Sequence, residues 1–270
     1  MRSESLPRDV LEALSAGSAG LAGRLRYRSA VDSTNDEALR LAELGAADGT
    51  AVFADEQRAG RGRRGRSWFS PAGAGLYVSV VVTPCNWPGG LPLVTLGAGI
   101  AAARGVGAVS GLPVELKWPN DLVVGRPWRK LGGVLSEALG SGARADAVVV
   151  GIGINLQPAA YPPDVAERAA SIEVELGRPV ERGRLLVAVL TEFERVVSRM
   201  RTEDAAWLIG EWRRLGGAGL RRAPVRWQDH GRWRRGAAVD LAPDGALVVE
   251  VDGRRDRIVA GEVLWERVES

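Results

Sequence analysis

The sequence predicts an α+β protein, in which a mixed β-sheet flanked by helices precedes a small C-terminal β-barrel. Apolar runs of strand length alternate with helical segments up to about residue 216. The run Gly216-Gly217-Ala218-Gly219 then interrupts this pattern. Beyond it, short strands alternate with Pro-Asp-Gly and Asp-Gly turns, a spacing typical of a small barrel.

The first half of the chain predicts a helix and three strands around a glycine-rich loop. Residues 7–16 favour a short helix with Pro7 in its first turn, followed by a Gly/Ala/Ser linker. Residues 24–31 predict a strand, and Thr34 to Glu37 match a capping box that opens a helix ending near Leu44. Strands are expected at 50–57 and 75–83. The residues between them, 58–74, form the arginine–glycine loop.

The remainder predicts one apolar helix, four strands, two amphipathic helices and the barrel. The apolar helix is expected at 91–109, and the strands at 113–118, 121–125, 131–139 and 145–156. The helices follow at 182–201 and 204–215, and the barrel strands at 223–228, 233–241, 246–251 and 255–260. We therefore divide the chain into an N-terminal helix and linker (1–28), a catalytic domain (29–216) and a C-terminal domain (217–270).

Composition excludes several classes of protein. The 270 residues are 46% hydrophobic and 26% charged, with a net charge of +3, too small for nucleic-acid binding unless it is concentrated. A single cysteine, Cys85, excludes disulfides within the chain and cysteine zinc sites. The first residues lack the apolar core of a signal peptide, and we expect no apolar run long enough to span a bilayer. We predict a cytoplasmic protein that binds no membrane.

Only two of the 36 basic residues are lysines, Lys117 and Lys130. An ammonium is a compact point charge, whereas a guanidinium is a wide planar fork, so a tight anion pocket distinguishes them. Codon bias with two chance survivors explains the composition equally well. The surroundings of the two lysines therefore decide between these explanations.

The arginine–glycine loop contains Gly60-Arg61-Gly62-Arg63-Arg64-Gly65-Arg66. Glycines let backbone amides approach an anion, and arginines supply charge and forked donors, so the loop suits phosphate oxygens. A solvated basic loop and an RNA-binding Arg/Gly segment remain alternatives. Glu56-Gln57 before the loop and Trp68-Phe69 within it favour a ligand site, because the aromatic rings can border a planar ligand.

Each lysine lies in a segment shaped by glycine, proline or asparagine. Lys117-Trp118-Pro119-Asn120-Asp121 joins two predicted strands, so Lys117 and Asp121 are expected at neighbouring strand ends. There a carboxylate can hold Mg²⁺ while the lysine meets a phosphate; a hairpin with an incidental ion pair is the alternative. Lys130-Leu131-Gly132-Gly133 opens the next strand, where glycines permit close approach.

Two further segments are weaker indications by themselves. Gly151-Ile152-Gly153-Ile154-Asn155 ends an apolar strand, and an amide there can read an adenine edge or simply cap the strand. Ser33-Thr34-Asn35 serves as a helix cap and as a candidate ligand contact. His230 is the only histidine and falls in a predicted turn, so no nucleophile–histidine arrangement can be assembled.

In this order, these segments resemble the biotin–protein ligase family, and the match spans most of residues 29–216. The related lipoate ligases share the fold without the arginine loop. The resemblance implies a catalytic fold of the biotin–lipoate ligase type, like class II aminoacyl-tRNA synthetases, with an SH3-like C-terminal barrel. It also implies two half-reactions. Biotin and MgATP give biotinyl-5′-AMP, and a lysine of a biotin carboxyl carrier domain then displaces AMP.

The resemblance also implies roles for individual residues. Lys130, Lys117 and Arg63 would be catalytic, and Asp121 would be a magnesium ligand. The predicted biotin-binding residues are Ser33, Thr34, Asn35, Gln57, Arg61, Gly62, Arg63, Lys130, Gly132 and Gly133. The predicted ATP or adenylate contacts are Arg63, Arg66, Trp68, Lys117, Asn120 and Asn155. Family members often stack an aromatic ring on adenine after this last segment; here only Tyr161 is available, and we leave it unassigned.

Fewer than 30 residues precede the first motif, too few for a winged helix-turn-helix. We therefore expect the monofunctional type, which binds no DNA, as a monomer or a homodimer. A lipoate–protein ligase, an RNA-binding protein and a biotin-responsive repressor are the rival hypotheses.

Overall fold

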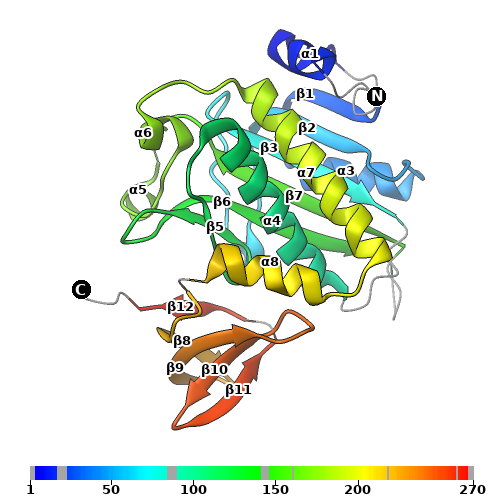
Figure 1. Cartoon of the computed structure of the whole chain (residues 1–270). Coiled ribbons are helices and arrows are strands. Elements are labelled where there is room, and N and C mark those ends of the chain that lie inside the picture. Colours follow the sequence, from blue (N-terminus) through cyan, green and yellow to red (C-terminus); the bar gives the residue numbers. More distant parts are fainter. Residues whose placement is uncertain are drawn as a thin grey trace.

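The computed structural model describes residues 4–16, 23–83, 90–140, 146–159, 161–217, 219–259 and 261–266. Two β-sheets follow one another along the chain, and helices cover the first of them (Figure 1). Cys85 and Ala218 lie outside these ranges, as does most of the expected linker after the first helix.

The first sheet has seven strands in the order β1-β2-β3-β7-β6-β5-β4. The strands are β1 (Leu25–Val31), β2 (Ala51–Gln57), β3 (Gly75–Val82), β4 (Glu115–Lys117), β5 (Asp121–Val124), β6 (Arg129–Leu139) and β7 (Ala147–Asn155). Only β1 and β2 pair in parallel; all other neighbours are antiparallel. The sheet is therefore mixed, as predicted.

Helices cover both faces of this sheet. The long helices α4 (Gly90–Ser110) and α7 (Arg182–Thr202) pack together on one face (Figure 1). Most of the buried apolar side chains lie on that side of the sheet. Helix α3 (Thr34–Glu43) covers the other face, above a small cluster that includes Ala38, Val52 and Val149. Alternate residues of β2, β3 and β7 thus face opposite layers.

Shorter elements complete the chain. Before the first sheet lies α1 (Arg8–Ser15), and the arginine–glycine loop holds a single 3₁₀ turn, η1 (Arg63–Gly65). After β7 come α5 (Pro163–Ala166) and α6 (Ile172–Leu176), and α8 (Ala206–Gly216) follows α7. The sequence patterns did not predict η1, α5 or α6, because elements of three to five residues carry too few positions to show a period.

The C-terminal region is a five-stranded antiparallel sheet in the order β11-β10-β9-β8-β12. Its strands are β8 (Ala223–Asp229), β9 (Arg232–Leu241), β10 (Leu247–Val251), β11 (Arg254–Ile258) and β12 (Val263–Trp265). The α+β fold with a small C-terminal β-domain is confirmed, although β12 was not predicted. The domain boundaries themselves stay predictions.

Two sequence expectations are wrong. The capping box on Thr34 is displaced by one residue, because Ser33 is the N-cap and its hydroxyl oxygen accepts from the Asp36 N–H at 3.5 Å. Glu37 pairs with Arg28 at 2.9 Å instead of capping the helix. An apolar run of spanning length also exists, since α4 has sufficient length and hydropathy to cross a bilayer. Most of α4 is buried against the sheet and α7, as expected of a core helix.

Candidate active site

One edge of the seven-stranded sheet collects most of the predicted site residues. β2 ends at Gln57 and β7 ends at Asn155, while β3 and β6, which run in the opposite direction, begin at this edge. The chain leaves β1 here and enters α3 at Ser33 and Thr34. The antiparallel pairing therefore brings together segments that are far apart in the sequence.

The two lysines meet at Asp121. Lys117 and Asp121 are cross-strand neighbours in the β4–β5 pair, and Lys130 Nζ lies 2.6 Å from Asp121 Oδ1. The Lys130 ammonium also lies 5.3 Å from the centre of the Trp68 ring, within the range of a cation–π contact. The predicted projection of Lys117 and Asp121 from neighbouring strands is confirmed, and Lys130 joins them.

Burial shifts the pKa of two cations in this cluster. Desolvation lowers the pKa of Lys117, and the nearby positive charges of Lys130 and Arg168 lower it further, although Asp121 opposes them. Desolvation likewise lowers the pKa of Arg63, whose guanidinium donates to Asn120 Oδ1 at 3.2 Å. Both cations lie near Asp121, and Lys117 also lies near Lys130, in a partly dry region where an anionic ligand would relieve the repulsion between the two lysines.

A polar network lies beside this cluster, beneath the N-terminus of α3. Gln57 Oε1 accepts from the backbone N–H of Thr34 at 2.9 Å and from its hydroxyl at 3.0 Å. Ser79 Oγ lies 2.7 Å from Thr34 Oγ1 and donates to Asn35 Oδ1 at 2.6 Å. Ser33, Thr34 and Asn35 are all buried. Hydrogen-bonding groups fixed in this way suit a small polar ligand ring.

The glycines of the β7 motif make room for side chains of other segments that pack directly on the β7 backbone. A Cβ on Gly151 would lie 2.2 Å from Asn35 Oδ1, and one on Gly153 would lie 2.6 Å from Trp68 Nε1. On the neighbouring strand, a Cβ on Gly132 would approach the Gly153 carbonyl to 2.7 Å. A Cβ on Gly133 would lie 3.4 Å from Lys130 Nζ, so this position borders the lysine directly.

The arginines of the loop have different partners. Arg61 donates to Asp36 Oδ1 at 2.6 Å and to Glu137 Oε2 at 2.7 Å. Arg66 pairs with Glu262 of the C-terminal domain, so this contact links the loop to that domain. A Cβ on Gly62 would approach the Arg66 carbonyl to 3.3 Å, because the loop folds tightly on itself there. Arg61 and Arg66 are thus held at opposite sides of the loop.

The side chains of two predicted nucleotide contacts, Asn155 and Asn120, already donate hydrogen bonds within the chain, whereas that of a third, Trp68, donates to none of the described residues. The Asn155 amide donates to the Ala170 carbonyl at 2.9 Å, and the Asn120 amide donates to the Val134 carbonyl at 2.9 Å. Both side chains thereby hold neighbouring segments, and adenine recognition by Asn155 stays a prediction. The indole N–H of Trp68 is buried without a hydrogen-bond acceptor among the described residues. Tyr161 packs against Phe69, with ring centres 5.9 Å apart.

Sequence reasoning missed four residues of the polar network. They are Asp36, Ser70, Ser79 and Glu137. Ser79 had a usable signal, because it is a small polar residue among the valines of the buried strand β3. Buried polar groups need partners, so a lone serine in such a strand indicates a polar neighbour. The other three had no such signal.

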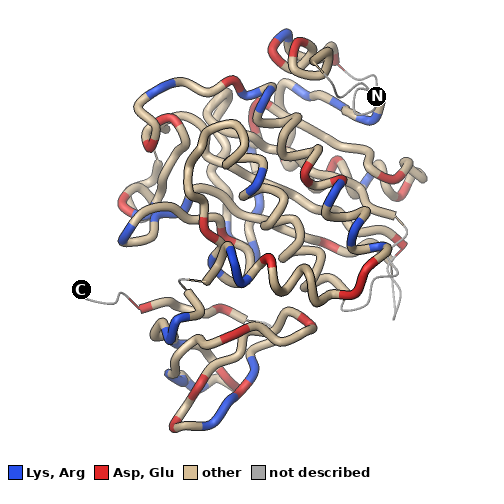
Figure 2. Tube along the Cα trace, in the orientation of Figure 1, with Lys and Arg blue, Asp and Glu red and all other residues tan. Residues whose placement is uncertain are grey.

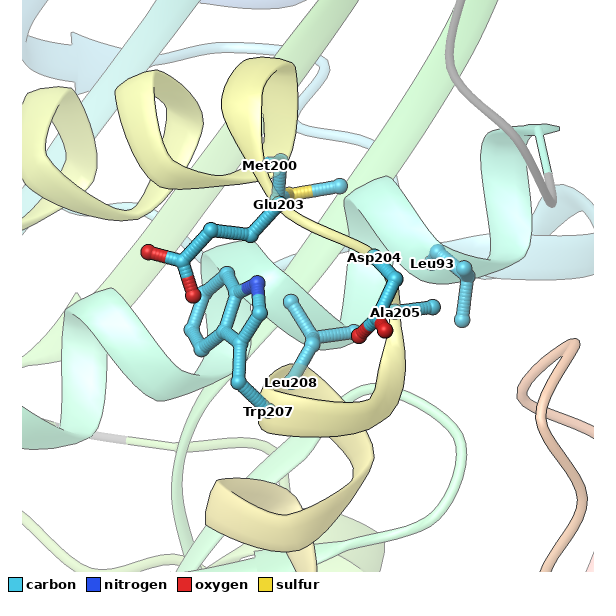
Figure 3. A pocket seen from close by; sticks show the side chains of 7 residues that line it. All are labelled: Leu93, Met200, Glu203, Asp204, Ala205, Trp207 and Leu208. Atoms are coloured by element: carbon cyan, nitrogen blue, oxygen red, sulfur yellow. The ribbon is translucent and has the colours of Figure 1, made fainter.

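A hollow elsewhere contains none of the predicted site residues. It lies where α7 ends and α8 begins (Figure 3). Its lining residues are Leu93, Met200, Glu203, Asp204, Ala205, Trp207 and Leu208. Acidic and basic positions are interspersed over much of the chain (Figure 2), although residues 58–66 hold five arginines and no acidic residue. Arg61 and Arg66 of this stretch pair with carboxylates of the same chain, which does not favour the RNA-binding alternative.

Comparison with known proteins supports a ligase. The family model described as the biotin/lipoate A/B protein ligase family matches residues 27–155. A biotin–[acetyl-CoA-carboxylase] ligase of Paracoccus denitrificans is 32% identical over 256 residues, which cover 87% of this chain and 97% of that protein. This chain belongs to the biotin protein ligase family.

Two further relatives support this biotin protein ligase assignment. A biotin protein ligase structure from Aquifex aeolicus, in complex with biotin and ATP, matches 91% of this chain and 99% of that chain, with a TM-score of 0.79 and 28% identity. The bifunctional ligase/repressor of Bacillus subtilis is 34% identical over 173 residues. That alignment covers 63% of this chain and only 53% of the Bacillus protein.

Proposed function

We propose that this chain is a biotin protein ligase, which activates biotin with ATP and transfers it to a lysine of a carrier domain. The observation that carries the proposal is the meeting of Lys130, Lys117 and Arg63 beside the network of Thr34 and Gln57. The three cations suit a cluster of phosphate and carboxylate oxygens. The hydrogen-bonding groups of Thr34 and Gln57 suit a small polar ring.

In the first half-reaction, a carboxylate oxygen of biotin attacks the α-phosphorus of ATP, and pyrophosphate leaves with the electrons of the broken P–O bond. The carboxylate is ionised at neutral pH, so this step needs no enzymic base. The chain must instead hold two anions together and stabilise negative charge as it develops. We propose that Lys130 and Lys117 perform that task, and that Arg63 adds charge from the loop.

In the second half-reaction, the neutral amine of an acceptor lysine attacks the acyl carbon of biotinyl-5′-AMP. An amide forms, AMP leaves with the C–O bond electrons, and the amine releases a proton. We propose that the acceptor belongs to a biotin carboxyl carrier domain. Reaction in the cytoplasm, as a monomer or a homodimer and without DNA or membrane, stays a prediction.

We further propose that Mg²⁺ accompanies ATP. Among the described residues no group of three His, Cys, Asp or Glu could hold a metal. Magnesium usually keeps several waters and binds through one or two carboxylates together with substrate phosphates. Asp121 fits as such a single carboxylate, although one of its oxygens already accepts from Lys130. The ion would neutralise phosphate charge, and chelation by EDTA should stop pyrophosphate release.

Biotin-dependent exchange of labelled pyrophosphate into ATP tests the proposed activity. We expect exchange with biotin and none with lipoate. Exchange with lipoate alone would favour a lipoate–protein ligase instead, and exchange with neither would contradict the proposed chemistry.

A further inference from the structure

A circuit of polar contacts begins and ends on the arginine–glycine loop. From Ser70, at one side of the loop, it runs through Gln57 and Thr34 to Ser79. From Ser79 it continues through Asn35 to Glu137, and from Glu137 to Arg61, at the other side of the loop. The resemblance assigned no role to Glu137, which is the last link of the circuit.

One oxygen of Glu137 holds two donors. Glu137 Oε2 accepts from Asn35 Nδ2 at 2.8 Å and from Arg61 at 2.7 Å. Glu137 lies in β6 opposite Val149 of β7, and its side chain is 26% exposed. Backbone hydrogen bonds pair these strands and do not need a carboxylate there. The position of this charge is explained by the two side chains that it binds.

The carboxylate also fixes the direction of the neighbouring hydrogen bonds. An ionised carboxylate only accepts, so Asn35 must turn its NH₂ group toward Glu137. The Asn35 carbonyl oxygen then faces Ser79, whose hydroxyl donates to it. Asn35 Nδ2 also donates to the Leu135 carbonyl at 3.3 Å, a longer contact that favours the same direction. A glutamine at position 137 would offer both a donor and an acceptor, so the stronger of the two controls on the Asn35 amide would be lost.

We propose that Glu137 is a positioning residue for biotin binding. Through Asn35 it sets which donors and acceptors the polar network offers, and through Arg61 it holds the arginine–glycine loop against α3 and β6. This inference rests on the proposed function, because it concerns how the same site recognises the ring of biotin.

A double-mutant cycle tests the proposal. Biotin dissociation constants and exchange kinetics are measured for the natural protein, Glu137→Gln, Arg61→Gln and the double variant. We expect Glu137→Gln to raise the KM for biotin about fivefold, a change of about 1 kcal/mol, near the upper limit for partly exposed ion pairs. The kcat and the KM for ATP should change less than about twofold, since Glu137 acts on binding. In the double variant the two effects should combine to clearly less than their product.

Glu115→Gln is the matched control. Glu115 is also 26% exposed and pairs with Arg126 at 2.7 Å, but it belongs to β4 and to neither the circuit nor the loop. It should leave the KM for biotin unchanged. Equal effects of Glu115→Gln and Glu137→Gln, or strictly multiplicative effects in the cycle, would overturn the role of Glu137.

Failure of the inference can be distinguished from failure of the proposed function. If the natural protein does not bind biotin, the proposed function fails and the inference fails with it. Normal binding with no effect of Glu137→Gln overturns the inference alone. Should Glu137→Gln not fold, the cycle is repeated with Glu137→Asp, which keeps the charge but shortens the side chain; an unchanged KM for biotin and no coupling to Arg61 would then overturn the proposal.

Discussion

Lys130 and Asp121 form an ion pair of 2.6 Å between two neighbouring strands. The pair places one ammonium group between a carboxylate and the Trp68 ring, beside Gly133. Only two lysines occur in the whole chain, and both neighbour this carboxylate. Chance explains the abundance of arginine but poorly explains where lysine is kept.

Lys130→Arg should abolish most adenylation. A guanidinium is wider than an ammonium and cannot occupy the same place between Asp121 and Trp68 without displacing one of them. We expect a loss of about 10²-fold in biotin-dependent pyrophosphate exchange, comparable to the loss of one transition-state donor. Arg129→Lys is the control on the same strand, because Arg129 pairs with Glu175 away from the lysines. Near-normal exchange by Lys130→Arg would refute the need for a compact cation.

Lys117→Met should separate stability from activity. Burial lowers the pKa of Lys117, so the folded protein holds this proton less tightly than the unfolded chain does. The free energy of unfolding should therefore rise with pH between the lowered pKa of the folded state and the ordinary lysine pKa. Lys117→Met should remove that rise and stabilise the protein at neutral pH, while exchange is lost. Urea unfolding at several pH values measures how the free energy of unfolding depends on pH. The same pH dependence in Lys117→Met and in the natural protein would contradict the role given to Lys117.

Gly151→Ala should damage the polar network. The new Cβ would lie 2.2 Å from Asn35 Oδ1, so the amide must leave its place above β7. We expect a loss of about 1–3 kcal/mol of stability, the usual cost of overpacking, together with weaker biotin binding. The control is Gly210→Ala in α8, where a Cβ meets nothing within 4 Å and the substitution should stabilise the helix by about 0.5–1 kcal/mol. Equal stability of the two variants would contradict the prediction, because it would show that Asn35 can move away from the new Cβ at little cost.

Trp118→Phe should loosen the contact between the two sheets. The buried indole N–H of Trp118 donates to the Gly245 carbonyl of the C-terminal domain at 2.9 Å. Phenylalanine cannot donate, and the acceptor left unpaired costs about 1–3 kcal/mol. Trp233→Phe is the control, since Trp233 is 53% exposed. Thermal unfolding measures both variants, and an unchanged midpoint for Trp118→Phe would argue against a stabilising contact.

The sequence predicts long elements well because burial on a helix or a strand leaves a period over many residues. The apolar run of β7 and the amphipathic pattern of α7 are examples. It also predicts which motifs meet, since Lys117 and Asp121 flank a turn and are therefore neighbours. It does not predict contacts that depend on how strands are ordered in space. Arg61 is separated from Glu137 by 76 positions, and only the order β3-β7-β6, with α3 above these strands, brings them together.

Local patterns also leave the direction of a side chain open. Thr34 matches a capping box as well as Ser33 matches an N-cap, and only the turn from β1 into α3 decides between them. Asn155 offers an amide at a strand end, but the following chain returns and places the Ala170 carbonyl against it. In both cases the side chain that the motif offered is already bound within the chain: the Thr34 hydroxyl donates to Gln57, and the Asn155 amide donates to Ala170.

The most direct test of the central claim is a mass measurement on an intact carrier domain. A biotin carboxyl carrier domain is incubated with biotin, MgATP and this protein, and then examined for modification. The proposed activity predicts a gain of one biotin on one lysine of the carrier, dependent on ATP and absent with Lys130→Arg. No gain with a carrier that a known biotin protein ligase modifies would contradict it.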